Sequence, residues 1–262
     1  MLCGGTDLIV ALRKRAIRPS LVVDVKGVPE LQPAIEWSDR SLRIGATTVM
    51  TQLIADARIG ASFPALIEGA RVVGSVQIRN RATLAGNVCN ASPAADTAPP
   101  LLVYDAGLEL VSAAGSRTVP LSGFFVGPRE TVLRPGELVS SILLPLPDGP
   151  TGSAFGRITR RRGVDLASVN LACRVTGRGP ARFAFGAVGP RPFVVDDETG
   201  VLADPDRSEA DERDALGRLS AYASPISDVR ASAEYRRAML LVAGRRVLTL
   251  AHARLEASGR AG

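Results

Sequence analysis

The most restrictive feature of the sequence is a stretch between Arg81 and Asp96 in which fourteen consecutive residues carry no charge. Most of its side chains are small, and others, such as those of Thr83 and Asn87, are neutral hydrogen-bonding groups. Surface loops seldom have this composition, because charged residues prefer solvent. Small residues let a backbone lie against a large, flat, polar ligand, and Asn and Thr can bind it. A buried packing segment, with Asp96 capping a following helix, would fit the pattern equally well.

A second turn of small residues opens the chain, where Cys3-Gly4-Gly5-Thr6 leads into an apolar stretch. We expect a helix over residues 7–14, with Thr6 or Asp7 as its N-cap. Glycines allow close approach to a phosphate, and free N–H groups at a helix start favour an anion. A plain turn before a capped helix would have the same sequence. Neither stretch contains the GxGxxG or GxxxxGK[ST] pattern of a single phosphate loop.

These motifs resemble those of the FAD-binding medium subunit of the molybdenum hydroxylases, the carbon monoxide dehydrogenase and xanthine dehydrogenase family. The resemblance covers essentially the whole chain, and its central motif at residues 79–97 is highly specific. The matching segments are residues 4–8, 44–46, 79–97, 120–125, 137–139, 161–167 and 231–237.

The resemblance implies an α+β fold in two parts. Residues 1–150 would form a two-subdomain FAD-binding domain of the vanillyl-alcohol-oxidase (PCMH) type, and residues 151–262 a smaller α+β C-terminal domain. The family has a strand–helix unit before the Gly-Gly motif, whereas this chain starts almost on the motif. Either the start of the chain was assigned too late, or the first lobe lacks that unit, which would leave a sheet edge and apolar surface uncovered. A second departure is Ala85, where the family usually has glycine, since a methyl group there requires a negative φ.

The resemblance also implies where FAD binds. The turns at residues 2–8 and 83–87 would bracket its pyrophosphate, and Asp96 would hold the ribityl chain or an adjoining polar part. The complete set of expected cofactor-binding residues is Leu2, Cys3, Gly4, Gly5, Thr6, Asp7, Leu8, Val73, Gly74, Thr83, Ala85, Gly86, Asn87, Asp96, Val139, Arg157 and Asp165.

Three members of this set also have simple structural explanations. Val139 matches a position that borders the cofactor but could be a core residue. Arg157 lies near where the family often places a basic residue by the flavin, and it could be a solvated charge. Asp165 matches a position that approaches the flavin edge and can influence access of the acceptor, and it could cap a helix.

The cysteine and histidine content limits the chemistry of the chain. Cys3, Cys89 and Cys173 are far apart and His252 is the only histidine, so we expect no metal site, and His252 is expected at the surface or at a helix end. The chain cannot hold iron–sulfur clusters itself. The resemblance implies a small 2Fe-2S subunit and a large molybdopterin-binding subunit as partners, with FAD passing electrons to an external acceptor. No residue is assigned a catalytic role. The alternative is a stand-alone or non-redox homologue with weakened or lost FAD binding.

Charge and hydropathy indicate where such a protein acts. The net charge of +6 suits an anionic cofactor or a negatively charged partner protein, while the 4% aromatic content is low for stacking on nucleic-acid bases. No segment approaches the ~20 apolar residues of a membrane span. Charged residues also interrupt any signal-peptide-like region near the start, so we expect a cytoplasmic protein.

Hydrophobic periodicity predicts the secondary structure. Helices are expected over residues 7–14, 50–56, 63–70, 209–219 and 233–255. Strands are expected over residues 21–25, 41–46, 107–113, 137–144, 168–176 and 181–188.

Overall fold

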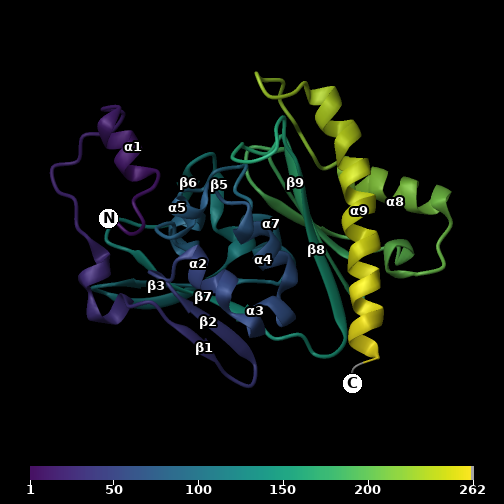
Figure 1. The fold of residues 1–262 in the computed structure, drawn as a ribbon, viewed down its shortest axis with the longest axis horizontal. Coiled ribbons are helices and arrows are strands. Elements are labelled where there is room, and N and C mark those ends of the chain that lie inside the picture. Colours follow the sequence, from purple (N-terminus) through teal and green to yellow (C-terminus); the bar gives the residue numbers. More distant parts are fainter. Residues whose placement is uncertain (261–262) are drawn as a thin grey trace.

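The computed structural model describes residues 1–260 and confirms an α+β chain with two main sheets (Figure 1). The five-stranded sheet has the order β1-β2-β7-β3-β4 and is antiparallel throughout. Its strands are β1 (Ile35–Trp37), β2 (Ser41–Gly45), β3 (Gly107–Ser112), β4 (Gly115–Pro120) and β7 (Leu138–Pro145). A short hairpin of β5 (Phe125–Gly127) and β6 (Glu130–Thr131) follows η3 (Leu121–Gly123).

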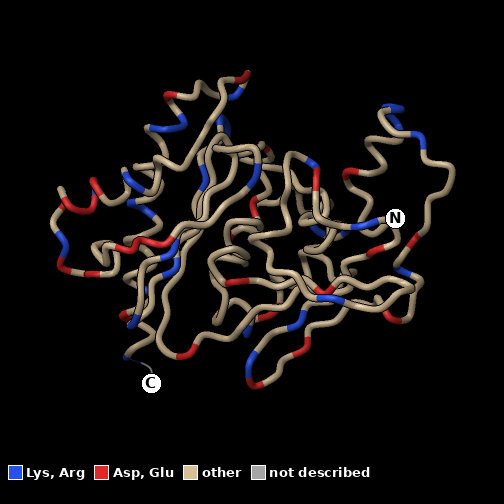
Figure 2. The backbone as a smooth tube through the Cα atoms, turned by 180° about the vertical axis from the view of Figure 1, so that it is seen from behind, with Lys and Arg blue, Asp and Glu red and all other residues tan. Residues whose placement is uncertain are grey.

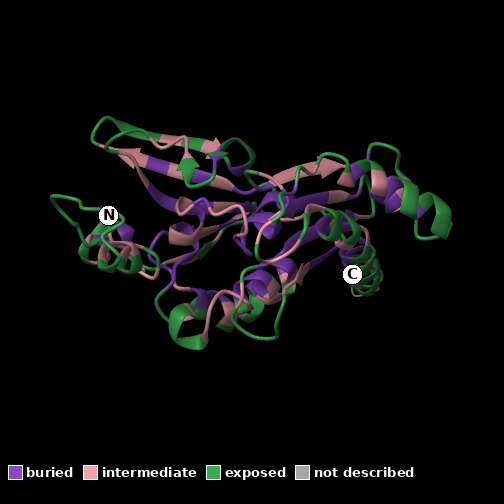
Figure 3. Cartoon of the chain, turned by 90° about the horizontal axis from the view of Figure 1, so that it is seen from above, coloured by how far each residue is buried: buried purple, intermediate pink, exposed green. Residues whose placement is uncertain are grey.

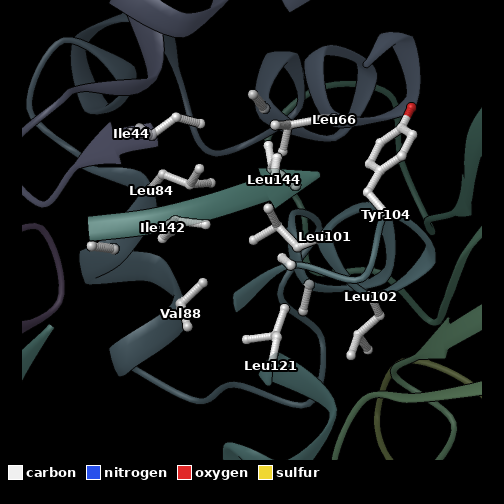
Figure 4. Packing of buried hydrophobic residues seen from close by; sticks show 14 of the residues in the cluster. Ile44, Leu66, Leu84, Val88, Leu101, Leu102, Tyr104, Leu121, Ile142 and Leu144 are labelled. Carbon is white, nitrogen blue, oxygen red and sulfur yellow. The ribbon is translucent and has the colours of Figure 1, made fainter. Parts of the chain in front are cut away.

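Helices cover one face of this sheet because alternate strand residues are apolar. Ile44 and Ile142 point into a core that also receives Leu66, Leu84 and Leu101 from the helices (Figure 4). The helices are α2 (Met50–Ala55), α3 (Ala57–Ser62), α4 (Pro64–Arg71), α5 (Val76–Arg79), α6 (Leu84–Cys89) and α7 (Ala98–Val103). The opposite face carries ion pairs, such as that between Arg43 and Glu109.

The N-terminal lobe, residues 1–31, lies to one side of the sheet and is mostly exposed or half-buried (Figures 1 and 3). It contains α1 (Leu8–Arg13), η1 (Val25–Gly27) and η2 (Pro29–Leu31). The predicted strand at residues 21–25 is wrong. Only Asp24 forms a bridge there, with Leu2, and Leu21 is 74% exposed, because no strand among the described residues lies alongside to complete a ladder. Asp7 occupies the N-cap position of α1, but its side chain makes no capping hydrogen bond.

The C-terminal half contains a four-stranded antiparallel sheet in the order β11-β10-β9-β8. Its strands are β8 (Thr151–Ile158), β9 (Val169–Thr176), β10 (Arg182–Gly186) and β11 (Phe193–Asp196), followed by η4 (Val201–Ala203), α8 (Glu209–Ser220) and α9 (Ala233–Gly259). Helix α9 packs along β8 and β9 (Figure 1). A Cβ atom at Gly152 would lie 1.9 Å from the Ala251 carbonyl oxygen, so only glycine allows this close approach.

The expectation that His252 lies at the surface or at a helix end is wrong. His252 is buried in α9, and its Nε2 atom lies 2.9 Å from the Leu202 carbonyl oxygen and 3.2 Å from the Arg207 guanidinium. The side chain is buried because η4 and the Arg207 segment pack over this part of the helix.

The other predicted elements are confirmed with small shifts at their ends, the last helix extending to Gly259 instead of residue 255. Hydrophobic periodicity did not predict the strands β1, β4, β5, β6, β8 and β11 or the short helices α3, α5, α6 and α7. Within residues 1–260, no helix is both long and apolar enough to span a membrane.

Polar contacts join the two halves of the chain. Glu68 on α4 accepts a hydrogen bond from the backbone N–H of Phe155, 2.9 Å away, and pairs with Arg254 on α9. The core of the first half extends to Phe155, Ala172 and Ala184 of the second sheet. The two sheets are therefore held in a fixed relation by both apolar packing and an ion pair.

A loop that precedes α9 is anchored by Asp228. One carboxylate oxygen accepts hydrogen bonds from the backbone N–H of Arg230 (2.7 Å) and from the buried Arg236 guanidinium (2.7 Å). Burial opposes ionisation of Asp228, but these donors and the N–H of Ala231 outweigh it and lower the pKa to about 2. This loop closes one side of the site described below.

We expect Asp228→Asn to reduce the free energy of unfolding by roughly 1–3 kcal/mol at neutral pH, because charge-assisted hydrogen bonds are lost. The pKa of Asp228 in the folded protein is below its ordinary value of 3.8, so the wild-type carboxylate stabilises the fold above that value and loses this effect as the pH falls towards about 2. The free energy of unfolding, measured by denaturant titration across this pH range, should depend less on pH in the variant than in the wild type. Asp206→Asn, at an exposed position, is the control. If Asp228→Asn reduced the free energy of unfolding equally at about pH 2 and at neutral pH, the stabilising role of the ionised Asp228 carboxylate would be contradicted.

Candidate functional site

A cavity of about 950 Å³ lies between the N-terminal lobe and the rest of the chain. This volume is near the upper end of the range of roughly 300–1,000 Å³ that is typical of small-molecule sites. The wall consists of residues from the first turn and α1, from the segment around α5 and α6, from β7, and from the loop between β8 and β9. Segments distant in sequence therefore form one continuous site.

The two small-residue turns meet at the floor of this cavity. A Cβ atom added to Gly4 would lie 2.3 Å from the Arg81 carbonyl oxygen and 3.0 Å from the Ala82 Cα atom. Real side chains do not tolerate such distances, so residue 4 has to be glycine for the turns to touch. The Cys3 thiol lies 3.4 Å from the Thr83 hydroxyl, and the Lys26 ammonium donates to the Cys3 carbonyl oxygen at 3.0 Å.

Hydrogen-bonding groups of both turns line the cavity, and the backbone N–H groups of the first turn are unused within residues 1–260. Within residues 1–260, no hydrogen bond is donated by the backbone N–H of Gly4, Gly5 or Thr6. In the second turn, the Thr83 hydroxyl caps α6 by accepting from the Gly86 N–H at 3.0 Å. The Asn87 side-chain oxygen accepts from Thr97 at 2.7 Å, which orients the amide. Gly4, Gly5 and Thr6 are half-buried, and their free N–H groups favour an anion, so this floor suits an anionic or oxygen-rich ligand.

Asp96 is the acidic residue at the end of the uncharged stretch, and it is 8% exposed. One of its carboxylate oxygens accepts from Arg157 at 2.8 Å and the other from the Asn170 amide at 2.9 Å. Desolvation raises the pKa of Asp96, and the two donors counteract this rise. Each oxygen accepts one protein hydrogen bond, so the carboxylate retains lone pairs that face the cavity.

Asp165 lies on the opposite wall, in the loop between β8 and β9. One oxygen of its carboxylate accepts from the backbone N–H of Leu166 at 3.0 Å and from Arg160 at 3.4 Å. The other oxygen, Oδ2, is buried and has no hydrogen-bond partner in the described structure. A buried acceptor without a donor is costly, so this atom is suited to a ligand group with an N–H or O–H.

The structure brings together all the site residues predicted from the sequence except Leu2 and Arg157, which do not line the cavity. Leu2 pairs through its backbone with Val23 and Val25, and Arg157 lies behind the wall, where it holds Asp96. Ala85 lies within α6 and therefore has the negative φ that its methyl group requires.

Sequence reasoning missed several residues at the mouth of the cavity. They are arginines 129, 160, 161 and 230 and the apolar residues Val164 and Leu166. The consecutive arginines at residues 160–162 were the available signal, but their distance from the two turns in sequence hid their relation to the site.

Comparison with known proteins identifies the family. Residues 1–147 match the FAD binding domain in molybdopterin dehydrogenase, and residues 154–251 match the CO dehydrogenase flavoprotein C-terminal domain. The chain belongs to the flavoprotein subunits of the molybdenum hydroxylases. This confirms the family that the sequence motifs indicated.

Alignments with relatives across the family cover most of the chain. It is 38% identical to a xanthine dehydrogenase FAD-binding subunit of Escherichia coli O157:H7 over 198 residues, which cover 74% of this chain and 68% of the relative. It is 30% identical to a carbon monoxide dehydrogenase medium chain of Hydrogenophaga pseudoflava over 259 residues, which cover 97% of this chain and 89% of the relative.

Solved structures confirm the fold. A carbon monoxide dehydrogenase from Hydrogenophaga pseudoflava superposes with a TM-score of 0.88 at 28% identity, covering 97% of this chain and 89% of that chain. A quinoline 2-oxidoreductase from Pseudomonas putida 86 gives a TM-score of 0.87 at 26% identity, covering 98% and 89%.

We expect Gly4→Ala to separate the two turns, because its methyl group would collide with the Arg81 carbonyl. The free energy of unfolding should fall by roughly 1–3 kcal/mol, as for overpacked sites. Gly60→Ala is the matched control, since nothing lies within 4 Å of its added Cβ atom in α3, and it should leave stability unchanged or raised. Chemical denaturation measures the free energy of unfolding of both variants. Equal values for Gly4→Ala and the wild type would contradict the close contact between Gly4 and the Arg81 carbonyl.

Proposed function

We propose that this chain is the flavoprotein subunit of a molybdenum-containing dehydrogenase, an oxidoreductase with FAD as its cofactor. In this proposal, electrons reach FAD from the 2Fe-2S clusters of a small partner subunit, which draws them from a large molybdopterin-binding subunit, and an external acceptor removes them. Family membership supports the proposal, as do relatives named as medium chains of carbon monoxide dehydrogenase and glyceraldehyde dehydrogenase.

The observation that carries the proposal is the contact between the two turns at the cavity floor. The N–H groups of Gly4, Gly5 and Thr6 have no acceptor within residues 1–260, and α6 begins beside them. A diphosphate needs a row of N–H donors and a closely approaching backbone, and this floor offers both. Residues 2–8 and 83–87 would therefore hold the pyrophosphate of FAD.

The walls suit the rest of the cofactor. The free lone pairs of Asp96 would accept hydrogen bonds from ribityl hydroxyl groups, while Arg157 and Asn170 keep the carboxylate in place. Val73, Gly74 and Val139 provide an apolar surface for a ring system. The Oδ2 atom of Asp165 lies 4.0 Å from the Arg161 Nε atom and has no hydrogen-bond donor within residues 1–260, so it would accept from a ring N–H or a bound water.

FAD, when bound, supplies reversible uptake and release of one or two electrons, and the protein supplies position and electrostatics. Within residues 1–260, no group of three or more His, Cys, Asp or Glu side chains could hold a metal ion. Burial raises the pKa of Cys89 to about 12, so this thiol stays protonated at neutral pH. Cys173 is fully buried in the second core. Cluster-bearing partners are therefore part of the proposal, which also places the complex in the cytoplasm.

The first test is the flavin content of the purified chain. We expect absorption bands of flavin and close to one FAD released per chain on denaturation. A stand-alone homologue that has lost FAD binding would yield colourless protein that added FAD does not reconstitute, and that result would overturn the proposal.

We expect Asp96→Asn to weaken FAD binding by about tenfold to a hundredfold, because a charge-assisted hydrogen bond is worth roughly 1.5–3 kcal/mol. Fluorescence titration of the apoprotein with FAD measures the effect. Asp105→Asn is the matched control, since Asp105 pairs with Arg174 and Arg182 and does not line the cavity. Equal affinity of Asp96→Asn and the wild type would exclude contact between Asp96 and the cofactor.

A further inference from the structure

A single basic side chain is buried in the described part of the chain. Charged residues of both signs are spread along the whole backbone (Figure 2), and most of them are exposed or half-buried. Arg236, near the start of α9, is 3% exposed, and no other arginine or lysine among residues 1–260 is buried. Taking a guanidinium out of water is costly unless the protein supplies an opposite charge and hydrogen bonds. The groups around Arg236 therefore show what this charge does.

The Arg236 guanidinium joins the ends of two neighbouring strands. Its Nη1 atom donates to the carbonyl oxygens of Ser168, at 2.7 Å, and of Ala187, at 2.9 Å. Ser168 directly precedes β9, and Ala187 directly follows β10. The Nη2 atom donates to the Asp228 carboxylate at 2.7 Å, which neutralises the charge. Arg236 thus fixes the start of one strand against the end of the next.

The same two strand ends hold the segment of the cavity wall that ends at Asp96. On β9, the Asn170 amide donates to the Asp96 carboxylate at 2.9 Å and to the Ala94 carbonyl oxygen at 3.4 Å. Beyond β10, the backbone N–H of Ala187 donates to the Pro93 carbonyl oxygen at 2.7 Å. Ala187 has a φ of 61°, which is unfavourable for a residue with a Cβ atom, so its surroundings maintain this conformation. Ala187 therefore links residues 93–96, through its N–H, to the buried guanidinium, through its carbonyl oxygen.

Close packing at Gly186 fixes the orientation of the Asn170 amide. A Cβ atom at Gly186 would lie 2.1 Å from the Asn170 Oδ1 atom and 3.2 Å from the Pro93 carbonyl oxygen. The other end of the amide, Nδ2, faces two acceptors, so only one orientation of the amide satisfies them. A side chain at position 186 would push the amide away from Asp96.

We propose that Arg236 is a positioning residue for the flavin site: by clamping the ends of β9 and β10, it fixes the Asp96 carboxylate. This inference rests on the proposed function. Arg236 does not line the cavity, so it acts on a bound cofactor only through other residues. Arg157 on β8 holds the second Asp96 oxygen, so the carboxylate is set from three neighbouring strands. Binding groups keep their productive geometry only when a supporting shell of hydrogen bonds locks them in place.

The test measures FAD affinity by fluorescence titration of the apoprotein, together with the visible circular dichroism of the bound flavin. Arg236→Lys keeps the positive charge beside Asp228 but replaces the planar fork of donors with a single nitrogen, which does not span both carbonyl oxygens in the same geometry. Gly186→Ala displaces the Asn170 amide from Asp96 by a different route. Each change is made both in the wild type and in the Asp96→Asn variant.

Arg254→Lys is the matched control. Arg254 also lies on α9 and donates to a strand carbonyl oxygen, that of Ser153, and its carboxylate partner is Glu68. Among the described residues it forms no hydrogen bond with residues 93–96. This variant should lose stability without losing affinity for FAD.

We expect Arg236→Lys and Gly186→Ala to bind FAD roughly threefold to tenfold more weakly than the wild type, as for the loss of one hydrogen bond. In the Asp96→Asn background the same changes should have less than about a twofold effect, because residues that act through one another are not additive. Both changes should alter the flavin dichroism as Asp96→Asn does, whereas Arg254→Lys should leave it unchanged.

Equal losses of affinity in both backgrounds, or wild-type affinity in both single variants, would overturn the inference and leave the proposed function intact. The same holds if Asp96→Asn itself binds FAD as the wild type does, since Asp96 then does not contact the cofactor. If Arg236→Lys does not fold, the comparison of Gly186→Ala in the two backgrounds decides the question. A wild-type chain that binds no FAD would overturn both the inference and the proposed function.

Discussion

The site depends on one backbone contact, between residue 4 and the Arg81–Ala82 peptide. No side chain fits there, since even a methyl group on Gly4 would overlap the Arg81 carbonyl oxygen. This contact brings the unpaired N–H groups of the first turn beside the start of α6, although about eighty residues separate them in sequence. The N-terminal lobe has little core of its own, and α1 buries no residue. Its position therefore depends on this contact and on the few hydrogen bonds around Cys3 and Lys26.

The second half of the chain completes the site from the other side. Arg157 on β8 and Asn170 on β9 hold the Asp96 carboxylate, and the loop between these strands supplies Asp165, Arg160 and Arg161 to the cavity wall. The pair formed by Glu68 and Arg254 fixes the second sheet against α4. A cofactor bound on the floor would thus lie between two sheets whose separation is set by the core, while the mouth is shaped by surface loops.

Parts of this arrangement could be predicted from sequence because they depend on local chemistry. Fourteen uncharged residues and a Gly-Gly turn indicated close backbone approach as one of two explanations, and both turns do line the cavity. Residues 84–89 of the uncharged stretch form α6, which Thr83 caps, and the small residues alone did not indicate this helix. The strand predicted at residues 21–25 failed because an apolar run does not reveal whether a neighbour exists to pair with it. His252 was misplaced because its burial depends on Leu202 and Arg207, which lie 50 and 45 residues away.

The most direct test of the central claim is hydrogen–deuterium exchange of the chain with and without FAD. If both turns close on one diphosphate, the amides of residues 4–6 and of residues 84–87 should become protected together, at the same FAD concentration. The N–H groups of Gly4, Gly5 and Thr6 should change most, because they have no acceptor among residues 1–260. Protection of only one turn, or of neither while FAD binds, would contradict the account.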